Sequence, residues 1–350
     1  MKTDHIIVGQ GICGSFLGHY LGKAGRDVIV IDQPRPFSAS RVASGVINPV
    51  TGRRLVRTWM IEDLMPFAVS AYGEWGTCLN AELIRRCPIL DFHSTPQMKL
   101  AFDSALEREA DYLAKPEDQN AWSDYFNPAF GIGEIKSSWL VDMPVLLEGY
   151  RKELQQQQLL LEESFDASGL VLKDHAIQYR GITARSVIFC DGVQGFDNPF
   201  FSRLPFTHMK GEALIIDIPG LPRDYIFKQG INIVPWRDGL FWVGSSYEWE
   251  FTDPGPTETF RLRTEAQLAQ WLKLPYTVTD HFAAGRPANI ERRPFVGFHP
   301  SFPCVGILNG MGAKGCTLAP YFAHQLAEHI VHQTPIHPLA DVRRFSRILG

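Results

Sequence analysis

The sequence predicts an α/β protein with a Rossmann-like domain and a second domain that contains an antiparallel β-sheet. Two strand–glycine–helix units predict the first domain: one begins at His5 and the other at Cys304. Short segments with alternating apolar residues lie between them and predict the second domain. The 350 residues exceed the size that one hydrophobic core usually organises, so two domains are expected.

The N-terminal unit begins with a short apolar strand, His5–Val8, and apolar residues recur at helical spacing from Ile12 onward. A second apolar strand, Val28–Ile31, follows and completes a βαβ unit. The turn between the first strand and the helix carries three glycines in a G-x-G-x-x-G pattern: Gly9, Gly11 and Gly14.

Each glycine of this turn has a physical role in nucleotide binding. Gly9 permits the tight turn, Gly11 lets the backbone approach a pyrophosphate, and Gly14 lets helix and strand pack closely. The N–H groups and the positive dipole end of the helix then face the phosphates. Asp32, at the end of the second strand, can accept hydrogen bonds from a ribose diol and would repel the 2′-phosphate of NADP. The pattern alone leaves both FAD and NAD open.

The remaining elements follow from periodicity and turn residues. Helices are predicted at 61–84, 96–113, 143–154, 257–272 and 316–331. Strands are predicted at 85–93, 134–141, 212–218, 231–246 and 305–308, with several short ones between 159 and 190.

We expect the first domain to be discontinuous, because its two glycine-rich units lie at opposite ends of the chain. It is predicted to comprise residues 1–78, 137–203 and 288–350. The second, substrate-binding domain is predicted to comprise residues 79–136 and 204–287.

Two further glycine-rich strand ends are candidate cofactor contacts. In "SVIFCDGV" a strand meets Asp191 and Gly192, and in "CVGILNGMGAKG" a strand runs into a loop and a helix begins. That helix N-terminus, with the ammonium group of Lys314, would stabilise negative charge on a reduced flavin or on a carboxylate substrate. The loop residues are Gly310, Met311, Gly312, Ala313 and Lys314.

Several arginines are candidates for binding an anionic substrate. Gly285-Arg286-Pro287 reads as a stiff turn that would hold a guanidinium in place, and a fixed arginine fork suits a carboxylate. A structural ion pair is the alternative role for Arg286. Arg54 and Arg57 belong to a basic group downstream of the Ser44-Gly45 loop, where an arginine near the cofactor would attract anions.

Composition excludes several classes. A net charge of −4 gives no general attraction to nucleic acid. Six cysteines without CxxC spacing argue against a zinc site and a disulfide scaffold, and they fit a reducing cytoplasm. No apolar stretch is long enough to span a bilayer, so no membrane segment is expected. No metal is expected either, because the cysteines lack the spacing of a zinc site.

Taken together, these segments resemble the D-amino-acid oxidase-like (DAO) family of FAD enzymes. The resemblance rests on "IIVGQGICGS", Asp32, "SASRVASGVINP", "VIFCDGV", "KGEALII", "FWVGSSYE", "AAGRPANIERRPFVG" and "NGMGAKG", in this order along nearly the whole chain. It implies a glutathione-reductase-like FAD fold of the DAO type. Besides the glycines and Asp32 above, it implies cofactor contacts from Ile12, Gln33, Ser44, Gly45, Phe165, Asp191 and Gly192.

The resemblance also implies site roles. Arg286 falls where glycine oxidase-like members bind a carboxylate, and Lys314 falls where sarcosine oxidase-like members do so. Arg54 and Arg57 correspond to their early arginines. The segment Arg286–Arg293 lacks the cysteine that attaches flavin covalently in sarcosine oxidases, so non-covalent FAD is expected.

The implied activity is oxidation of the C–N bond of a small amino acid or secondary amine by hydride transfer to flavin N5. Oxygen or another acceptor would take the electrons, and Trp242 falls where oxidases of the family keep an oxygen-activating lysine. Two alternatives remain: a tRNA wobble-uridine carboxymethylamino-modifying oxidoreductase, against which the acidic balance weighs, and a flavin-binding protein without turnover.

Overall fold

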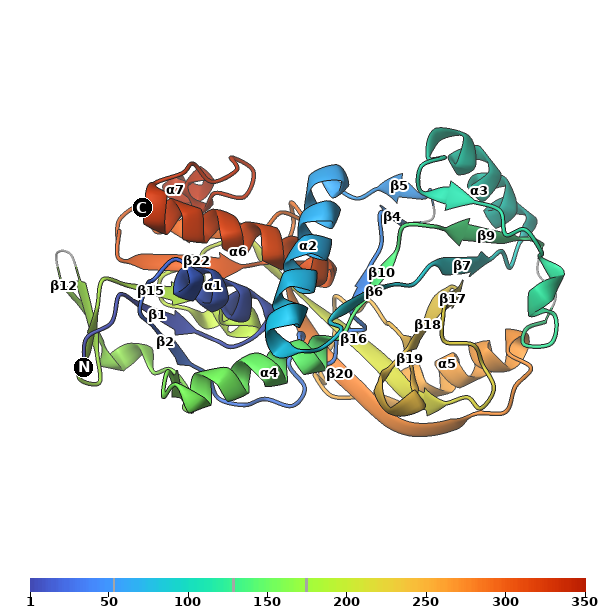
Figure 1. The fold of residues 1–350 in the computed structure, drawn as a ribbon, viewed down its shortest axis with the longest axis horizontal. Coiled ribbons are helices and arrows are strands. Elements are labelled where there is room, and N and C mark those ends of the chain that lie inside the picture. The colour runs from blue at the N-terminus through green and yellow to red at the C-terminus, as the bar shows by residue number, and fades with distance from the viewer. Residues whose placement is uncertain (53, 128–129, 174–175) are drawn as a thin grey trace.

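The computed structural model describes residues 1–52, 54–127, 130–173 and 176–350. Two large sheets lie toward opposite ends of the long axis, and helix α2 (Ile61–Leu79) stands between them (Figure 1). Both chain termini lie on the side of the smaller sheet (Figure 1). The predicted fold class, a Rossmann-like unit joined to a second β-rich unit, is confirmed.

The smaller sheet has six strands in the order β11-β2-β1-β15-β22-β21. All neighbouring pairs are parallel except β21 with β22. The strands are β1 (His5–Val8), β2 (Val28–Ile31), β11 (Leu160–Leu161), β15 (Ser186–Phe189), β21 (Phe295–Phe298) and β22 (Val305–Asn309).

Both faces of this sheet are covered, which explains why its strands read as continuous apolar runs. On one face α1 (Ile12–Lys23) and α6 (Gly315–His332) pack in a common core with Ile7 and Val30. On the other face Ile6 and its neighbours meet the small sheet β12-β13-β14 and the C-terminal segment. These elements are β12 (Leu170–Lys173), β13 (Ala176–Tyr179), β14 (Ile182–Ala184) and α7 (Ser346–Leu349).

The larger sheet has eight strands in the order β20-β16-β19-β18-β17-β7-β9-β8. Its pairs are antiparallel as expected, except that β17 pairs with β7 in parallel, so the sheet is mixed. The strands are β7 (Ile89–Phe92), β8 (Leu113–Ala114), β9 (Ile132–Ile135), β16 (Phe206–Asp217), β17 (Ile226–Gln229), β18 (Ile231–Pro235), β19 (Phe241–Gly244) and β20 (Thr277–Asn289).

Helices cover the larger sheet on both faces, and alternation along β16 assigns its residues to them. Leu214 and Ile216 pack with α5 (Glu258–Trp271). Ala213 and Ile215 point the opposite way and share a core with α3 (Pro96–Arg108). The remaining strands form two small sheets, β3-β10-β6 and β4-β5: β3 (Val46–Ile47), β4 (Val50–Thr51), β5 (Val56–Arg57), β6 (Ile84–Arg86) and β10 (Trp139–Val141). Helix α4 (Met143–Gln156) packs in the same core as α1.

The predicted stiff turn at Gly285-Arg286-Pro287 is wrong. These residues lie within β20, which pairs with β16 along nearly its whole length. Strand β20 is the edge of its sheet, where the missing N–H of Pro287 is tolerated. Pairing with a long neighbour therefore overrides the turn preference of glycine and proline at this place.

Two predicted helices end earlier than expected. Helix α2 stops at Leu79, where Asn80 adopts a left-handed conformation, and α3 stops at Arg108. No helix in the described part of the chain is both long and apolar enough to cross a membrane. The same residues contain no cluster of His, Cys, Asp and Glu side chains suited to a metal ion, and the six cysteines are free.

Candidate functional site

The parallel strands β1, β2, β15 and β22 end at the same edge of the smaller sheet, and the predicted glycine loops meet there. A Cβ atom on Gly9 would lie 2.5 Å from the Cys190 carbonyl oxygen, and one on Gly14 would lie 1.9 Å from the Gly9 oxygen. These two glycines therefore allow tight packing of the turn. Of the described residues beyond its chain neighbours, only Ser40 would lie within 4 Å of a Cβ on Gly11, so Gly11 presents bare backbone.

The second glycine-rich loop begins where β22 ends. Gly310 and Gly312 both have positive φ, +78° and +57°, which favours glycine over other residues. A Cβ on Gly315 would lie 3.6 Å from Ile12, at the start of α1, so the N-termini of α1 and α6 adjoin. Their partial positive charges add at one place, which suits a bound anion.

Asp191, which follows β15, is part of a hydrogen-bond network that joins the Asp191-Gly192 segment to the loop at Gly310. The Asn309 amide donates to Asp191 Oδ1 at 2.9 Å and to the Gly192 carbonyl at 2.8 Å, and its own oxygen accepts from the Gly310 N–H at 2.7 Å. Asn198 donates to Asp191 Oδ2 at 2.9 Å. Burial raises the pKa of Asp191 to about 6, although these hydrogen bonds act in the opposite sense.

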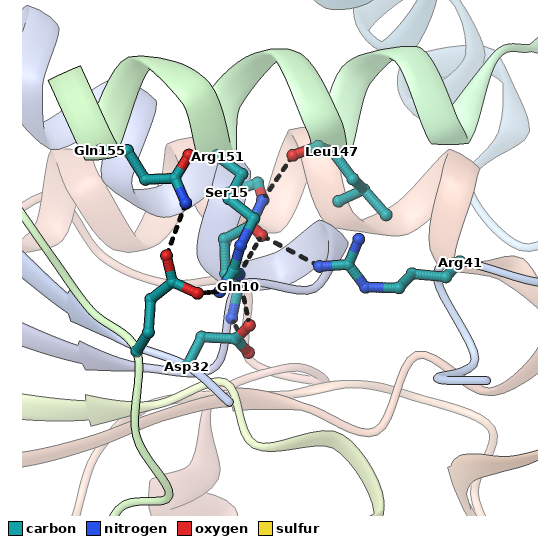
Figure 2. Close-up of polar contacts among 8 residues, drawn as sticks. Gln10, Ser15, Asp32, Arg41, Leu147, Arg151 and Gln155 are labelled. Carbon is teal, nitrogen blue, oxygen red and sulfur yellow. Dashed lines mark hydrogen bonds and ion pairs between the residues drawn. The ribbon is translucent and has the colours of Figure 1, made fainter. Parts of the chain in front are cut away.

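Asp32 is already engaged by the protein. Figure 2 shows its carboxylate between the backbone of Gln10 and the guanidinium of Arg151, which reaches down from α4. Gln10 N donates to Asp32 Oδ1 at 2.8 Å, and Arg151 Nη1 lies 2.8 Å from Oδ2. Both side chains are largely buried. The acid at the predicted ribose position is thus fixed in place and partly neutralised.

Gln10 and the segment after β2 form a second set of contacts near the glycine turn (Figure 2). Arg41 and Arg151 each donate to the Gln10 side-chain oxygen at 3.2 Å. Ser40 Oγ accepts from the Ile12 N–H at 3.1 Å, which is a position that a phosphate oxygen could take. In the described chain, no carboxylate lies within 4.0 Å of the half-buried Arg41, although the charges of Asp32 and Glu148 act on it from farther away. Arg41 therefore has no direct ion-pair partner among these residues.

The other expected cofactor residues differ in exposure. Gln33 and Ala313 are exposed, Ser44 is half-buried, and Gly45 and Met311 are buried. Gly45 has a positive φ, and a Cβ there would lie 2.0 Å from the Val141 oxygen, so it serves chain packing. The ring of Phe165 stacks on Tyr179 at 4.5 Å.

Arg286 lies on one face of the larger sheet, which we call the site face. Its guanidinium covers Gly211 on β16, where a Cβ would come within 2.1 Å of Nη2. Nη1 donates to the Ser246 carbonyl at 3.3 Å, and the group packs against the Tyr247 ring at 5.2 Å. Burial lowers the pKa of the Arg286 guanidinium from its ordinary value. No ion pair within 4.0 Å joins it to a carboxylate of the described residues.

Lys314 lies in the 3₁₀ turn Gly312–Lys314, which directly precedes α6. A Cβ on Gly312 would lie 3.4 Å from Ala288 of β20, so this turn touches the strand that carries Arg286. Lys314 Nζ donates to Thr58 Oγ1 at 3.2 Å. Burial lowers its pKa, and the nearby charges of Arg292 and Arg293 lower it further.

Arg54 and Arg57 do not join Arg286 and Lys314. Arg57 forms ion pairs with Glu109 and Glu62, the latter at 2.7 Å, and packs on Tyr112. Arg54 is exposed, and its carbonyl accepts from Arg108. Thr58, the residue after Arg57, is buried and accepts the hydrogen bond from Lys314 instead.

Trp242 lies on the site face, opposite Ile215 of β16 and Val234 of β18. It is 5% exposed, and its indole N–H donates to the Val42 carbonyl at 3.0 Å. The segment 40–42 therefore reaches from the glycine turn at Ser40 to the larger sheet at Trp242.

The arrangement fits a dinucleotide. Bare backbone at Gly11, two adjoining helix N-termini and the Arg41 guanidinium, which has no ion pair within 4.0 Å among the described residues, suit a pyrophosphate. Asp32 retains acceptor capacity for a ribose. Sequence reasoning missed Gln10, Arg41, Thr58, Arg151 and Asn309. Gln10 and Asn309 had a local clue, since each lies within a glycine-rich motif. The contacts of Arg41 with Gln10, of Arg151 with Asp32 and of Thr58 with Lys314 join residues far apart in the sequence.

Comparison with known proteins gives consistent matches. The model of the DAO family, described as FAD dependent oxidoreductase, matches residues 4–329. A glycine oxidase of Pseudomonas aeruginosa is 24% identical over 96% of this chain and 97% of its own length.

Solved structures agree in fold. Glycine oxidase from Bacillus cereus superposes with a TM-score of 0.81 at 15% identity, covering 99% of this chain and 98% of its own. L-proline dehydrogenase from P. horikoshii superposes with a TM-score of 0.77 at 16% identity, covering 99% and 98%.

Proposed function

The chain belongs to the DAO family of FAD dependent oxidoreductases, and on this premise we propose that it oxidises the C–N bond of a small amino acid or secondary amine that carries a carboxylate. Arg286 is the observation that carries the proposal. A guanidinium that is half-buried, free of carboxylate partners among the described residues and held flat against Gly211 is prepared for an anionic ligand.

FAD fits the edge of the smaller sheet. Its pyrophosphate would be held by Gly11, Ile12 and Arg41, and its ribose by Asp32. The Gly310–Lys314 loop would approach the flavin, and Asn309 holds that loop through the Gly310 N–H. We propose non-covalent binding, because Arg286–Arg293 contains no cysteine.

When bound, FAD would supply the hydride acceptor: the substrate would lose a hydride from carbon and a proton from nitrogen, and the resulting imine would be hydrolysed by water. The chain's own residues bind and orient the substrate. Arg286 would hold the carboxylate, and Lys314 would add positive charge from the turn that contacts β20. Because the pKa of Lys314 is lowered, its ammonium group loses its proton at a lower pH than that of an ordinary lysine.

We propose that the electrons from the substrate pass mainly to an acceptor other than oxygen. The place where oxidases of the family keep an activating lysine corresponds to Trp242, a buried indole whose N–H is already bonded to a carbonyl. It provides no mobile positive charge for oxygen reduction.

We also propose the division into a cofactor domain (1–78, 137–203 and 288–350) and a substrate domain (79–136 and 204–287). Strand membership supports it: every strand of the six-stranded sheet comes from the first set. The eight-stranded sheet uses the second set, with β20 running two residues past the boundary.

Two experiments test the proposal. Acid precipitation of one sample shows whether flavin leaves the protein. A second, native sample is screened with amines and amino acids under anaerobic conditions, and bleaching of the flavin absorbance is measured. We expect free flavin in the supernatant, bleaching by a carboxylate-bearing amine, and slow recovery in air. Flavin that stays with the pellet would refute non-covalent binding. A flavoprotein that no amine bleaches would refute the oxidoreductase assignment and favour a flavin-binding protein without turnover.

A further inference from the structure

The site face carries a second polar group of residues beyond Arg286. In a β-ladder, residues directly opposite one another point to the same face. Ala213 on β16 pairs with Gly244 on β19, which pairs with Asn232 on β18. Asn232 pairs with Lys228 on β17, and Lys228 pairs with Asp91 on β7. We call Asn232, Lys228 and Asp91 the polar row.

Short residues separate the polar row from Arg286. Gly211 pairs with Ala284, one pleat along the strands from Ala213 and nearer Arg286, and Ala213 faces Gly244. None of these four carries a side chain longer than a methyl group. Gly211 and Asn232 are two strands apart and one pleat along, so their backbones lie roughly 12 Å apart. The Arg286 guanidinium itself covers Gly211, so a small molecule held by it would extend over Ala213 and Gly244 toward the polar row.

The polar row has unused hydrogen-bonding capacity. Lys228 Nζ lies 2.7 Å from Asp91 Oδ2, and the carboxylate is 4% exposed. Its other oxygen, Oδ1, has no partner among the described residues. Asn232 is half-buried, and among the residues that the structure describes its amide donates only to the Gly244 carbonyl, at 3.5 Å, which is the limit for such a bond. A buried carboxylate oxygen left unpaired is costly, so a donor is expected beside it.

The charges of the row select the ligand. Lys228 and Asp91 neutralise each other, and the Lys228 side chain remains 26% exposed. A second carboxylate on the ligand would meet Asp91, and an ammonium group would meet Lys228. A group that both donates and accepts without net charge would satisfy the row.

From this geometry we propose that the polar row binds the far end of the substrate and that the substrate is an amino acid whose side chain ends in a neutral hydrogen-bonding group, such as an amide or a hydroxyl. This rests on the proposed function, in which Arg286 holds the carboxylate. Asn232 is the specificity-determining residue, because it contacts that group without holding an ion pair together.

The test measures binding of unreactive acids to the FAD-loaded protein through the change in flavin absorbance. Succinamate carries a carboxylate and an amide, 4-methylpentanoate replaces the amide with an apolar group of the same shape, and succinate carries two charges. We expect the wild-type protein to bind succinamate about 5- to 150-fold tighter than 4-methylpentanoate. Asn232→Leu should remove that preference and leave the affinity for propionate unchanged.

Gln229→Met is the matched control, since Gln229 is one residue from Lys228 and its side chain points to the other face. It should keep the preference for succinamate. Equal binding of the two acids by the wild-type protein, or tightest binding of succinate, would overturn the inference without any variant having to fold. If no acid binds and no amine bleaches the flavin, the proposed function itself fails; if amines bleach it but succinamate is not preferred, only this inference fails.

Discussion

Gly211→Ala tests the role of Arg286 without removing its charge. A Cβ atom at this position would lie 2.1, 2.2 and 2.4 Å from Nη2, Cζ and Nη1 of Arg286. Ordinary contacts begin near 3.4 Å, so the guanidinium must move by about an ångström or more. Because the clash is with the end of a flexible side chain, and Gly211 has no positive φ, the strand itself should tolerate alanine.

The expected loss follows from the contact that is displaced. A charge-assisted hydrogen bond to a guanidinium contributes about 1.5–3 kcal/mol, which corresponds to roughly 10- to 150-fold in affinity. The assay is the dissociation constant of propionate, measured by flavin absorbance with FAD kept saturating. Gly22→Ala is the control, because a Cβ there has no atom of the described residues within 4 Å beyond its own helix and chain neighbours. Unchanged affinity in Gly211→Ala, with the same melting temperature as the wild type, would refute the assignment of this guanidinium pose to carboxylate binding.

Two further predictions concern the cofactor and Lys314. Arg41→Met should weaken FAD binding to the apoprotein about 10- to 150-fold, because a pyrophosphate loses its half-buried counter-charge; titration by flavin fluorescence checks this, with the exposed Arg35→Met as control, and equal affinities of the two variants would contradict it. Propionate affinity should fall as the pH rises through the lowered pKa of Lys314, because the ammonium form that attracts the anion is lost there. Lys314→Arg should abolish that decline, and a decline that persists in the variant would assign it to another group.

Much of the fold could be predicted because the information is local. In the βαβ unit, the apolar runs, the glycine turn and the helical stripe all lie within residues 5–32, and each follows from neighbouring side chains. The same holds for the loop at Gly310–Lys314. The resemblance to the DAO family added the expectation of a DAO-type fold for the whole chain, and the DAO family model matches residues 4–329.

The failed predictions concern segments whose conformation depends on distant partners. Gly285-Arg286-Pro287 reads as a turn in isolation but becomes an edge strand, because β16 lies beside it and supplies the ladder of hydrogen bonds. At Asp32 the expected hydrogen bonds to a ribose stay a prediction. What the sequence did not indicate is the ion pair of its carboxylate with Arg151, which is far along the chain.

The sequence by itself therefore determined the cofactor-binding motif, the fold class and the family, since short-range pattern and residue order carry them. Only the tertiary structure decided which charges meet. It turned Arg57 toward Glu109 and Glu62, set Lys314 against Thr58, and laid Arg286 over Gly211. These contacts join residues from different strands and loops, and long side chains can point to either side of a backbone. Their direction is fixed by sheet register and packing, which no short stretch of sequence encodes.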